Sequence, residues 1–219
     1  MDDVYREWFD SNTVSVKVDL QNANDFLTKI EIAELTGAPK GSTIHVKQDG
    51  AVISFAVSNE IFSEDMYRYL VAENNGFSYH LKNVVLVLRK EYMEMGIGPR
   101  CVIMEIHAAA NLLNEVPINS IKVSAVGNYD SFFWENEPLR GYYVWARMGF
   151  DAKIPPTVLA KLAQPYQNLT LVSDLMRTVG GRSEWLVHGD SVDLEFDLKR
   201  NSVSWLLLSQ YMSEKGIKL

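Results

Sequence analysis

Hydrophobic residues recur with two different periods along this chain, and segments of one period alternate with segments of the other. Apolar and polar residues alternate over 14–20 and over 192–198, which is typical of half-buried strands. The apolar residues of 24–36 and of 99–113 instead gather on one helical face. Strands and helices that alternate in this way predict an α/β protein, α+β in the strict sense, in which helices flank one sheet.

The Asp49-Gly50 dipeptide predicts a tight turn between two short strands at 43–47 and 51–57. This dipeptide readily adopts the positive φ angles of a two-residue hairpin, so the two strands are expected to be antiparallel. The other predicted elements are a strand at 120–126 and helices at 139–148, 157–164, 170–178 and 202–214.

The most apolar segment of the chain is Val84–Leu88, which contains no polar residue. A continuous apolar run is typical of a strand buried on both faces, so this segment is predicted to lie at the centre of the sheet. Residues 64–73, which precede it, are predicted to be a helix. Ser63 suits the N-cap of that helix, and two acidic residues follow it in the first turn.

Acidic residues outnumber basic ones by 28 to 21, which gives a net charge of -7 and a pI near 5.1. Non-specific binding to nucleic acid or to an anionic membrane needs a dense array of Lys and Arg. The composition therefore argues against both kinds of partner. The chain also has no apolar run of the roughly 18 residues that a membrane span needs, and no signal-peptide pattern at its start.

Cys101 is the one cysteine of the sequence, which excludes an intrachain disulfide and a zinc site built from cysteines. A lone cysteine fits a reducing compartment, so a cytoplasmic protein is predicted. Cys101 follows the start of a predicted helix, where the pKa of a thiol falls, but no histidine partner is defined for it. The four histidines are scattered without metal-ligand spacing, and no metal site is predicted.

A loop that contains Gly96-Ile97-Gly98 follows the apolar strand and leads to a helix that begins with Pro99. A helix N-terminus presents unpaired N–H groups and partial positive charge, and glycines let an anion approach the backbone. Phosphate binding is one interpretation, and a tight strand-to-helix turn is the other. No Gly-Lys-Ser/Thr follows, which excludes a Walker loop, and the third glycine of the dinucleotide fingerprint is absent.

Two segments occur in a suggestive order: Val84–Arg100, with these glycines, and Arg140–Phe150, with its terminal Gly-Phe pair. They resemble motif A and the last helix of the GNAT superfamily of acyl-CoA N-acyltransferases. The resemblance covers roughly residues 40–155. It implies a GNAT-like domain at 1–155, with a mixed, mostly antiparallel central sheet flanked by helices. Residues 156–219 are expected to form a helix and strand extension packed on the same core.

The resemblance implies an acyl-CoA site between two strands that splay apart, with acetyl-CoA or another acyl-CoA as cofactor. A small amine or amino-acid-like acceptor would attack the thioester directly, helped by a base and by an acid for the departing thiolate. By analogy, the backbone of Val87, Leu88 and Arg89 would pair with the pantetheine arm, and the amides of Met95, Gly96, Ile97 and Gly98 would hold the pyrophosphate.

The glycine loop departs from the family pattern. Met93 stands where the family usually has Gln or Arg, and Glu94 adds a carboxylate beside the expected pyrophosphate. Pro99 suits the first helical turn but has no N–H to offer an anion. Arg100 is therefore predicted to supply the missing phosphate contact.

The last helix departs from the family pattern as well. Trp145 replaces the family's frequent tyrosine, the expected thiolate acid, and an indole does not protonate a thiolate. Tyr142, one turn earlier on the same helical face, is the predicted acid, and the adjacent Tyr143 is the weaker alternative. Glu60 is the predicted general base, with ordinary solvation as the alternative interpretation.

Three hypotheses follow: an acyl-CoA-dependent N-acyltransferase, a catalytically degenerate GNAT-fold protein that binds a ligand or partner, and an unrelated α/β domain whose glycine loop is only a turn. The predicted partner is a small-molecule amine. A homodimer is a further possibility, because the aromatic residues that gather in 132–145 could form a subunit contact. An acidic row at Asp193, Glu195 and Asp197 is interpreted as the solvated face of an edge strand, with attraction of a basic amine as the alternative.

Overall fold

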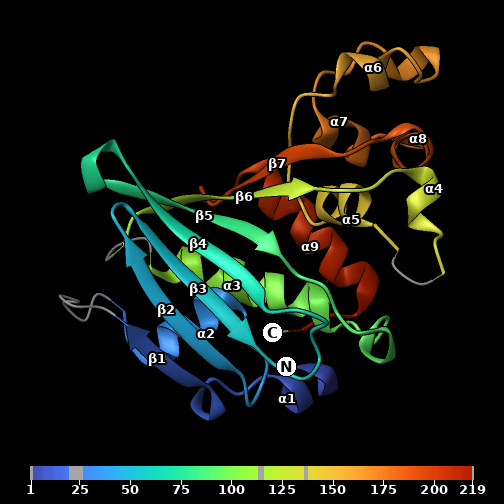
Figure 1. Ribbon diagram of the computed structural model, residues 1–219. Helices are drawn as coiled ribbons and strands as arrows, with labels where there is room; N and C mark the ends of the chain where they lie inside the picture. Colours follow the sequence, from blue (N-terminus) through green and yellow to red (C-terminus); the bar gives the residue numbers. More distant parts are fainter. Residues whose placement is uncertain (1, 20–26, 113–115, 136–137, 219) are drawn as a thin grey trace. The chain divides into compact units, whose positions relative to one another are not determined.

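A computed structural model describes residues 2–19, 27–112, 116–135 and 138–218 (Figure 1). The chain contains two compact units. Unit 1 comprises Met1–Ile121 with Ile217–Leu219, and unit 2 comprises Lys122–Gly216. The domain boundary predicted at residue 155 lies inside unit 2.

Unit 1 contains three helices and five complete strands among its described residues: α1 (Asp3–Trp8), β1 (Ser15–Asp19), α2 (Lys29–Thr36), β2 (Thr43–Asp49), β3 (Val52–Ser58), β4 (Met66–Glu73), β5 (Ser78–Val85) and α3 (Ile97–Asn111). Strand β6 (Ile118–Ala125) begins in unit 1 and ends in unit 2. Unit 2 continues with α4 (Tyr129–Phe132), α5 (Gly141–Arg147), α6 (Pro156–Leu159), α7 (Val172–Arg177), α8 (Gly181–His188), β7 (Val192–Asp197) and α9 (Val203–Lys215).

The described strands are hydrogen-bonded in the order β1-β2-β3-β4-β5-β6-β7. β1 is parallel to β2, whereas β2, β3, β4 and β5 pair antiparallel with their neighbours. The predicted hairpin between β2 and β3 is confirmed, with Asp49 opposite Val52 and Gly50 at a φ of 56°. The fold class is therefore α+β as predicted, with a mixed, mostly antiparallel sheet flanked by helices.

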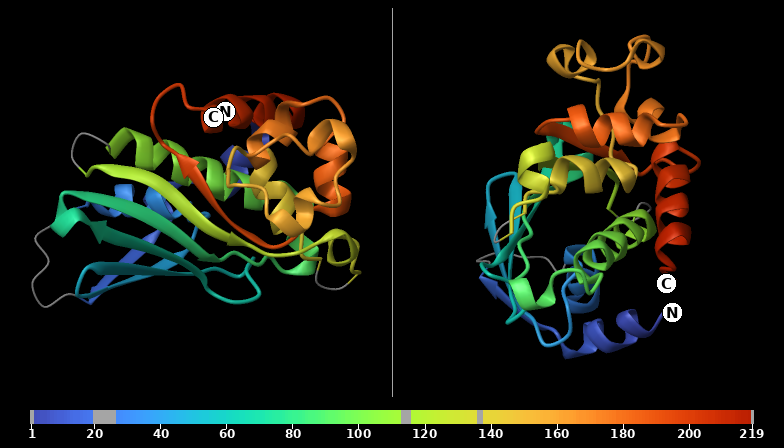
Figure 2. Two further views of the ribbon diagram at one scale, coloured as in Figure 1. Left: turned by 90° about the horizontal axis from the view of Figure 1, so that it is seen from above. Right: turned by 90° about the vertical axis from the view of Figure 1, so that its right-hand side faces the viewer.

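Helices α2 and α3 cover the same face of the β1–β5 part of the sheet (Figure 2). The alternation of strand residues directs one set of side chains towards these helices, and most of that set is apolar. The hydrophobic core of unit 1 includes Leu35, Ile44, Val46, Phe55, Val57, Leu70, Leu81, Ile103 and Ile106.

The helix predicted over 64–73 is wrong, because these residues form strand β4. Met66, Arg68 and Leu70 are buried while the residues between them are half-buried, so the burial period is two. Hydrogen-bonded ladders to β3 on one side and β5 on the other stabilise the extended chain. These long-range pairings outweigh the local capping signal at Ser63.

The prediction that Val84–Leu88 lies in a strand inside the sheet holds for Val84 and Val85, which end β5 between β4 and β6, but the predicted burial on both faces is wrong. Strand β5 ends at Val85, and Val84 and Val87 are 46% and 40% exposed. The β4–β5 ladder shifts register close to this point, where β5 ends. Beyond it, Leu88 forms only an isolated antiparallel bridge.

The remaining elements follow their predictions more closely. β1, α3, β6, α5, β7 and α9 lie within a few residues of the predicted segments. Residues 20–26, which include the start of the helix predicted over 24–36, lie outside the described residues, as does the end of the helix predicted over 99–113. α1, α4 and α8 are not among the elements that the sequence predicts.

The core of unit 2 surrounds Trp185 of α8, which is fully buried and donates its indole N–H to the carbonyl oxygen of Tyr142 at 3.0 Å. Phe150 and Phe196 are also fully buried, and their ring centroids lie 5.4 Å apart. None of the described helices of either unit is long and apolar enough to cross a membrane.

Candidate functional site

The segment Leu86–Arg89 follows β5 and is bonded on one side to the segment Ile61–Ser63. Two backbone hydrogen bonds flank the antiparallel bridge between Phe62 and Leu88: Ser63 N–H donates to the Val87 carbonyl at 3.0 Å, and Arg89 N–H donates to the Ile61 carbonyl at 2.9 Å. In an antiparallel pair of this kind, the N–H and C=O of the bridged residue point away from the partner strand. Leu88 therefore presents both backbone groups on the opposite side.

The three residues predicted to pair with pantetheine thus differ in what they offer. Val87 uses its carbonyl, and Arg89 its N–H and its side-chain Nε, for bonds within the protein. The backbone N–H and C=O of Leu88 make no hydrogen bond to any residue that the structure describes. Of these three residues, Leu88 is the one that leaves both backbone groups open to an extended ligand.

The glycine turn begins α3 directly above this segment. Gly96 is the N-cap in the left-handed conformation (φ 75°), and no side chain caps the helix. Gly98 is buried so closely on the segment that a Cβ added to it would lie 3.5 Å from Leu88 and 3.6 Å from Leu86. Ile97 is fully buried and anchors the turn in the core. The structure thus brings Leu88 together with the turn predicted to hold a pyrophosphate.

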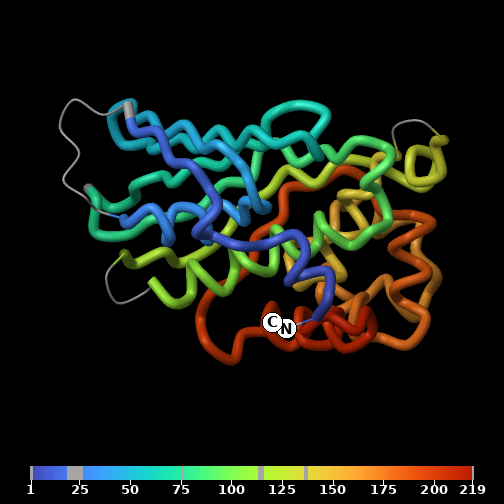
Figure 3. The backbone as a smooth tube through the Cα atoms, turned by 90° about the horizontal axis from the view of Figure 1, so that it is seen from below, coloured from blue at the N-terminus to red at the C-terminus, as the bar shows by residue number. Residues whose placement is uncertain are grey.

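Arg100, the predicted phosphate contact, is 6% exposed and fully engaged within unit 1. Its Nη1 donates to the Gly96 carbonyl at 2.8 Å, and its Nε and Nη2 donate to the Asp2 carboxylate at 3.1 and 2.7 Å. Asp2 also accepts from the backbone N–H groups of Tyr5 and Lys218, so the two ends of the described chain lie side by side (Figure 3). A phosphate would therefore have to displace Asp2 to reach this guanidinium.

Asp2 is accordingly held as a carboxylate. Burial alone would raise the pKa of this group, but the hydrogen bonds from Arg100, Lys218 and Tyr5 lower it to about 2.

The two predicted catalytic residues belong to different units. Glu60 is exposed and immediately precedes the Ile61–Ser63 segment, which pairs with the Leu88 segment on the side away from the open backbone groups of Leu88. Tyr142 lies on α5 of unit 2, where it is fully buried and donates its hydroxyl proton to the Leu186 carbonyl at 2.6 Å. Burial raises the pKa of Tyr142 to about 12. Its phenol is already committed as a donor within unit 2.

A polar cluster that the sequence did not predict lies in the core of unit 1. Arg68 on β4 and Glu105 on α3 are both fully buried, with Arg68 Nε 3.3 Å from Glu105 Oε1. Asn83 on β5 donates to the other carboxylate oxygen at 2.9 Å. Burial raises the pKa of Glu105 to about 7, against the opposing effects of Arg68 and Asn83. The sequence did not predict this cluster because residues 64–73 were expected to form a helix. Only the alternation of a strand directs Arg68 into the core.

Cys101 is fully buried, and burial raises the pKa of its thiol to about 12, which argues against a nucleophilic role. The acidic row of β7 is exposed at all three positions, as the interpretation of a solvated strand face predicts. Among the residues that the structure describes, no group of three or more His, Cys, Asp or Glu could hold a metal ion.

Comparison with known proteins adds little to this site. No protein-family model matches the chain, and no curated protein matches it either. One solved structure, "The crystal structure of KacTA-DNA complex", aligns over 74% of this chain and 76% of that one, with 15% identity and a TM-score of 0.34. A likeness at that level supports no functional argument.

Proposed function

We propose that this chain binds acetyl-CoA or another acyl-CoA and transfers the acyl group to a small amine or amino-acid-like acceptor. The juxtaposition of Leu88 with Gly98 carries the proposal. An extended, amide-bearing ligand adds to a strand edge through main-chain hydrogen bonds, which the free N–H and C=O of Leu88 supply. Phosphate groups further along the same ligand meet the uncapped N-terminus of α3 at the glycine turn.

Charge near the turn is mixed. Arg89 and Lys90 are exposed just before it and supply cations for a pyrophosphate, in addition to the partial positive charge of the helix terminus. Glu94 is exposed as well, and its negative charge opposes the binding of an anion. A solvent-screened carboxylate beside a pyrophosphate costs roughly 1 kcal/mol of binding free energy. The balance favours binding of an anion at moderate affinity.

In the proposed reaction a neutral amine attacks the thioester carbonyl. A C–N bond forms, the C–S bond breaks, and CoA leaves as the thiolate while the amine nitrogen loses a proton. Glu60 is the base of this proposal, since it lies beside the segment that pairs with Leu88. Water protonates the thiolate, because the hydroxyl of Tyr142 already donates to Leu186.

A second candidate function is binding of an acyl-CoA or a related ligand without turnover. Two observations favour it: Tyr142 is buried and hydrogen-bonded, and the charge of Arg100 is neutralised by Asp2. Three further statements stay predictions: that nucleic acid is not a partner, that a membrane is not a partner, and that the chain can form a homodimer.

Titration calorimetry with CoA and acetyl-CoA tests the proposal. Gly98→Glu is expected to abolish binding, because its carboxylate would occupy the space between Leu88 and the turn. Gly98→Ala is the matched control, since its Cβ makes only ordinary van der Waals contacts and the variant should fold. Equal affinities in wild type and a folded Gly98→Glu variant would remove the turn from the site.

The choice between the two functions needs a second measurement. Acetyl-CoA is incubated with a broad panel of amines and amino acids, and release of free CoA thiol is followed. Thiol release that depends on the amine supports transfer. Binding of acetyl-CoA without release with any acceptor supports the non-catalytic function, and absence of CoA binding by wild type contradicts both.

A further inference from the structure

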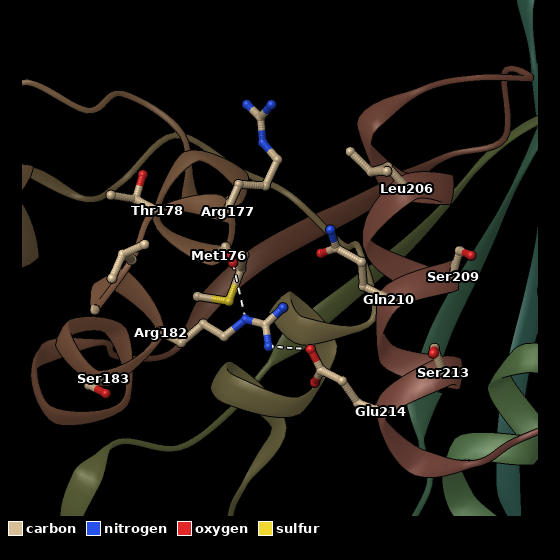
Figure 4. A pocket seen from close by; sticks show the side chains of 12 residues that line it. Met176, Arg177, Thr178, Arg182, Ser183, Leu206, Ser209, Gln210, Ser213 and Glu214 are labelled. Carbon is tan, nitrogen blue, oxygen red and sulfur yellow. Dashed lines mark hydrogen bonds and ion pairs between the residues drawn. The ribbon is translucent and has the colours of Figure 1, made fainter.

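Unit 2 contains a pocket of about 620 Å³ that the acyl-CoA proposal does not use. Its walls are the end of α7, the Thr178–Gly180 loop, the start of α8 and one face of α9 (Figure 4). Pockets for small ligands usually measure roughly 300–1,000 Å³, so this one has the size of a small-molecule site.

Arg182 is held in a fixed orientation at the base of this pocket. Its Nε donates to the Met176 carbonyl at 3.1 Å, and its Nη1 donates to Glu214 at 2.6 Å. Its other terminal nitrogen, Nη2, makes no hydrogen bond to any described residue. In Figure 4 this nitrogen points towards Gln210. An arginine fork that is positioned by two partners and still has donors to offer is well prepared to bind an oxyanion.

The charge around this fork is not balanced. Glu214 accepts from Arg147 through one carboxylate oxygen and from Arg182 through the other, so one carboxylate faces two guanidinium groups. The hydrogen bond from Arg182 keeps the pKa of Glu214 below its usual range, and the group stays ionised at neutral pH. The remaining cation of the pocket, Arg177, pairs with Asp174 at 2.9 Å. One net positive charge is left beside Arg182 in a chain whose overall charge is -7.

The other walls supply neutral donors and apolar surface. The side chains of Ser209, Gln210 and Ser213 on α9 line the pocket and make no hydrogen bond to any residue in the described part of the chain. Leu206 is 50% exposed and Val179 is 94% exposed at the rim. A ligand that seats a polar head near Gln210 would cover apolar side chains with the rest of its body.

We infer that this pocket binds a small monocarboxylate with an apolar body. The carboxylate accepts from Arg182 Nη2 and from the side-chain amide of Gln210, and the apolar body lies on Leu206 and Val179. A single net positive charge matches a monoanion rather than a phosphate dianion, and the planar guanidinium matches the planar carboxylate. The site is independent of the proposed acyl-CoA site, which lies in unit 1.

The test uses the full chain and fluorine NMR titration with 4-fluorobenzoate as the probe. Saturable binding is expected for wild type, and 4-fluorobenzamide, the neutral isostere, should bind at least tenfold more weakly. Gln210→Glu places a carboxylate beside Nη2 without disturbing the Arg182–Glu214 pair, and should weaken 4-fluorobenzoate at least tenfold. Gln164→Glu, an exposed change of the same kind outside the pocket, is the matched control and should leave the affinity unchanged.

Arg182→Gln should also weaken the probe at least tenfold, with Arg200→Gln as its control. Arg182 donates hydrogen bonds to the Met176 carbonyl and to Glu214, so folding of the Arg182→Gln variant must be checked. The Gln210→Glu variant breaks no such hydrogen bond to a described residue. No saturable binding by wild type up to about 10 mM would overturn the inference, as would an unchanged affinity in Gln210→Glu. Tighter binding of 4-fluorophenyl phosphate than of 4-fluorobenzoate would overturn the assignment to a carboxylate.

Discussion

Asp2 and Arg100 are 98 positions apart in the sequence, and their side chains form an ion pair with 2.7 Å between Oδ2 and Nη2. The same carboxylate accepts the backbone N–H of Lys218 at 3.1 Å. This partly buried pair therefore connects the start of α1 and Lys218 to the beginning of α3.

Asp2→Asn is expected to lower the free energy of unfolding by about 2–2.5 kcal/mol, the stabilisation that a carboxylate pKa of about 2 represents. Because the pKa is lowered on folding, the contribution is complete above about pH 4 and is lost as the pH falls towards 2. Urea titrations between pH 2 and 7 measure this dependence. Asp3→Asn, at a fully exposed neighbour, is the control, and an equal loss in both variants would contradict the role of the ion pair.

Tyr142→Phe is expected to destabilise the protein by about 1–2 kcal/mol, because it leaves the partly buried Leu186 carbonyl without its donor. The rate of acyl transfer per folded molecule should be unchanged. Tyr143→Phe is the matched control, since the structure shows no hydrogen bond for that hydroxyl to a described residue. Denaturation curves and thiol-release rates measure the two effects. A tenfold fall in kcat with intact stability would instead restore Tyr142 as the thiolate acid.

The buried Glu105 predicts a stability that falls as the pH rises. Its pKa is raised on folding, so the folded state binds the proton more tightly than the unfolded state. The stabilisation is complete below about pH 4.5 and is lost as the pH rises through about 7.

Glu105→Gln should flatten this dependence between pH 5 and about 8, and Glu91→Gln, at an exposed site, should not. Chemical denaturation at each pH provides the measurement. If Glu105 is instead ionised throughout and paired with Arg68, wild type would show no slope there, and the Gln variant would lose about 3–5 kcal/mol at every pH.

Gly149→Ala is expected to cost more than about 2 kcal/mol in unfolding free energy. Its φ of 98° disfavours any side chain, and a Cβ would lie 2.2 Å from the Ser204 carbonyl oxygen. Gly216→Ala has a positive φ of 64° as well but meets nothing within 4 Å, so it should cost only about 1 kcal/mol. Similar losses in the two variants would show that the close approach of α9 is unimportant.

Local signals predicted part of this fold well. The Asp49-Gly50 turn and the alternating residues of β7 depend on neighbours in sequence, and the structure confirms both predictions. Strand β4 was missed because its state is decided by ladders to β3 and β5, which no local pattern reports.

The candidate sites show the same division. The glycine turn could be found from its position before a helix, but the free edge at Leu88 depends on pairing with Phe62, 26 residues earlier. The Arg182–Glu214 pair joins residues 32 positions apart, and the Asp2–Arg100 pair joins residues 98 apart. The partners of a charged side chain follow from the topology, so the sequence alone could not distinguish a free arginine from a committed one.

Because Cys101 is buried, the reactivity of its thiol can be used to measure local opening of the folded protein. A thiol-specific reagent added to the native protein reacts only when the α3 core is exposed, because this is the single cysteine and it is fully buried. Labelling rates under native conditions therefore report the free energy of the opening that exposes Cys101 in unit 1. Comparison with the global unfolding free energy then tells whether the two units open together or as separate cooperative segments.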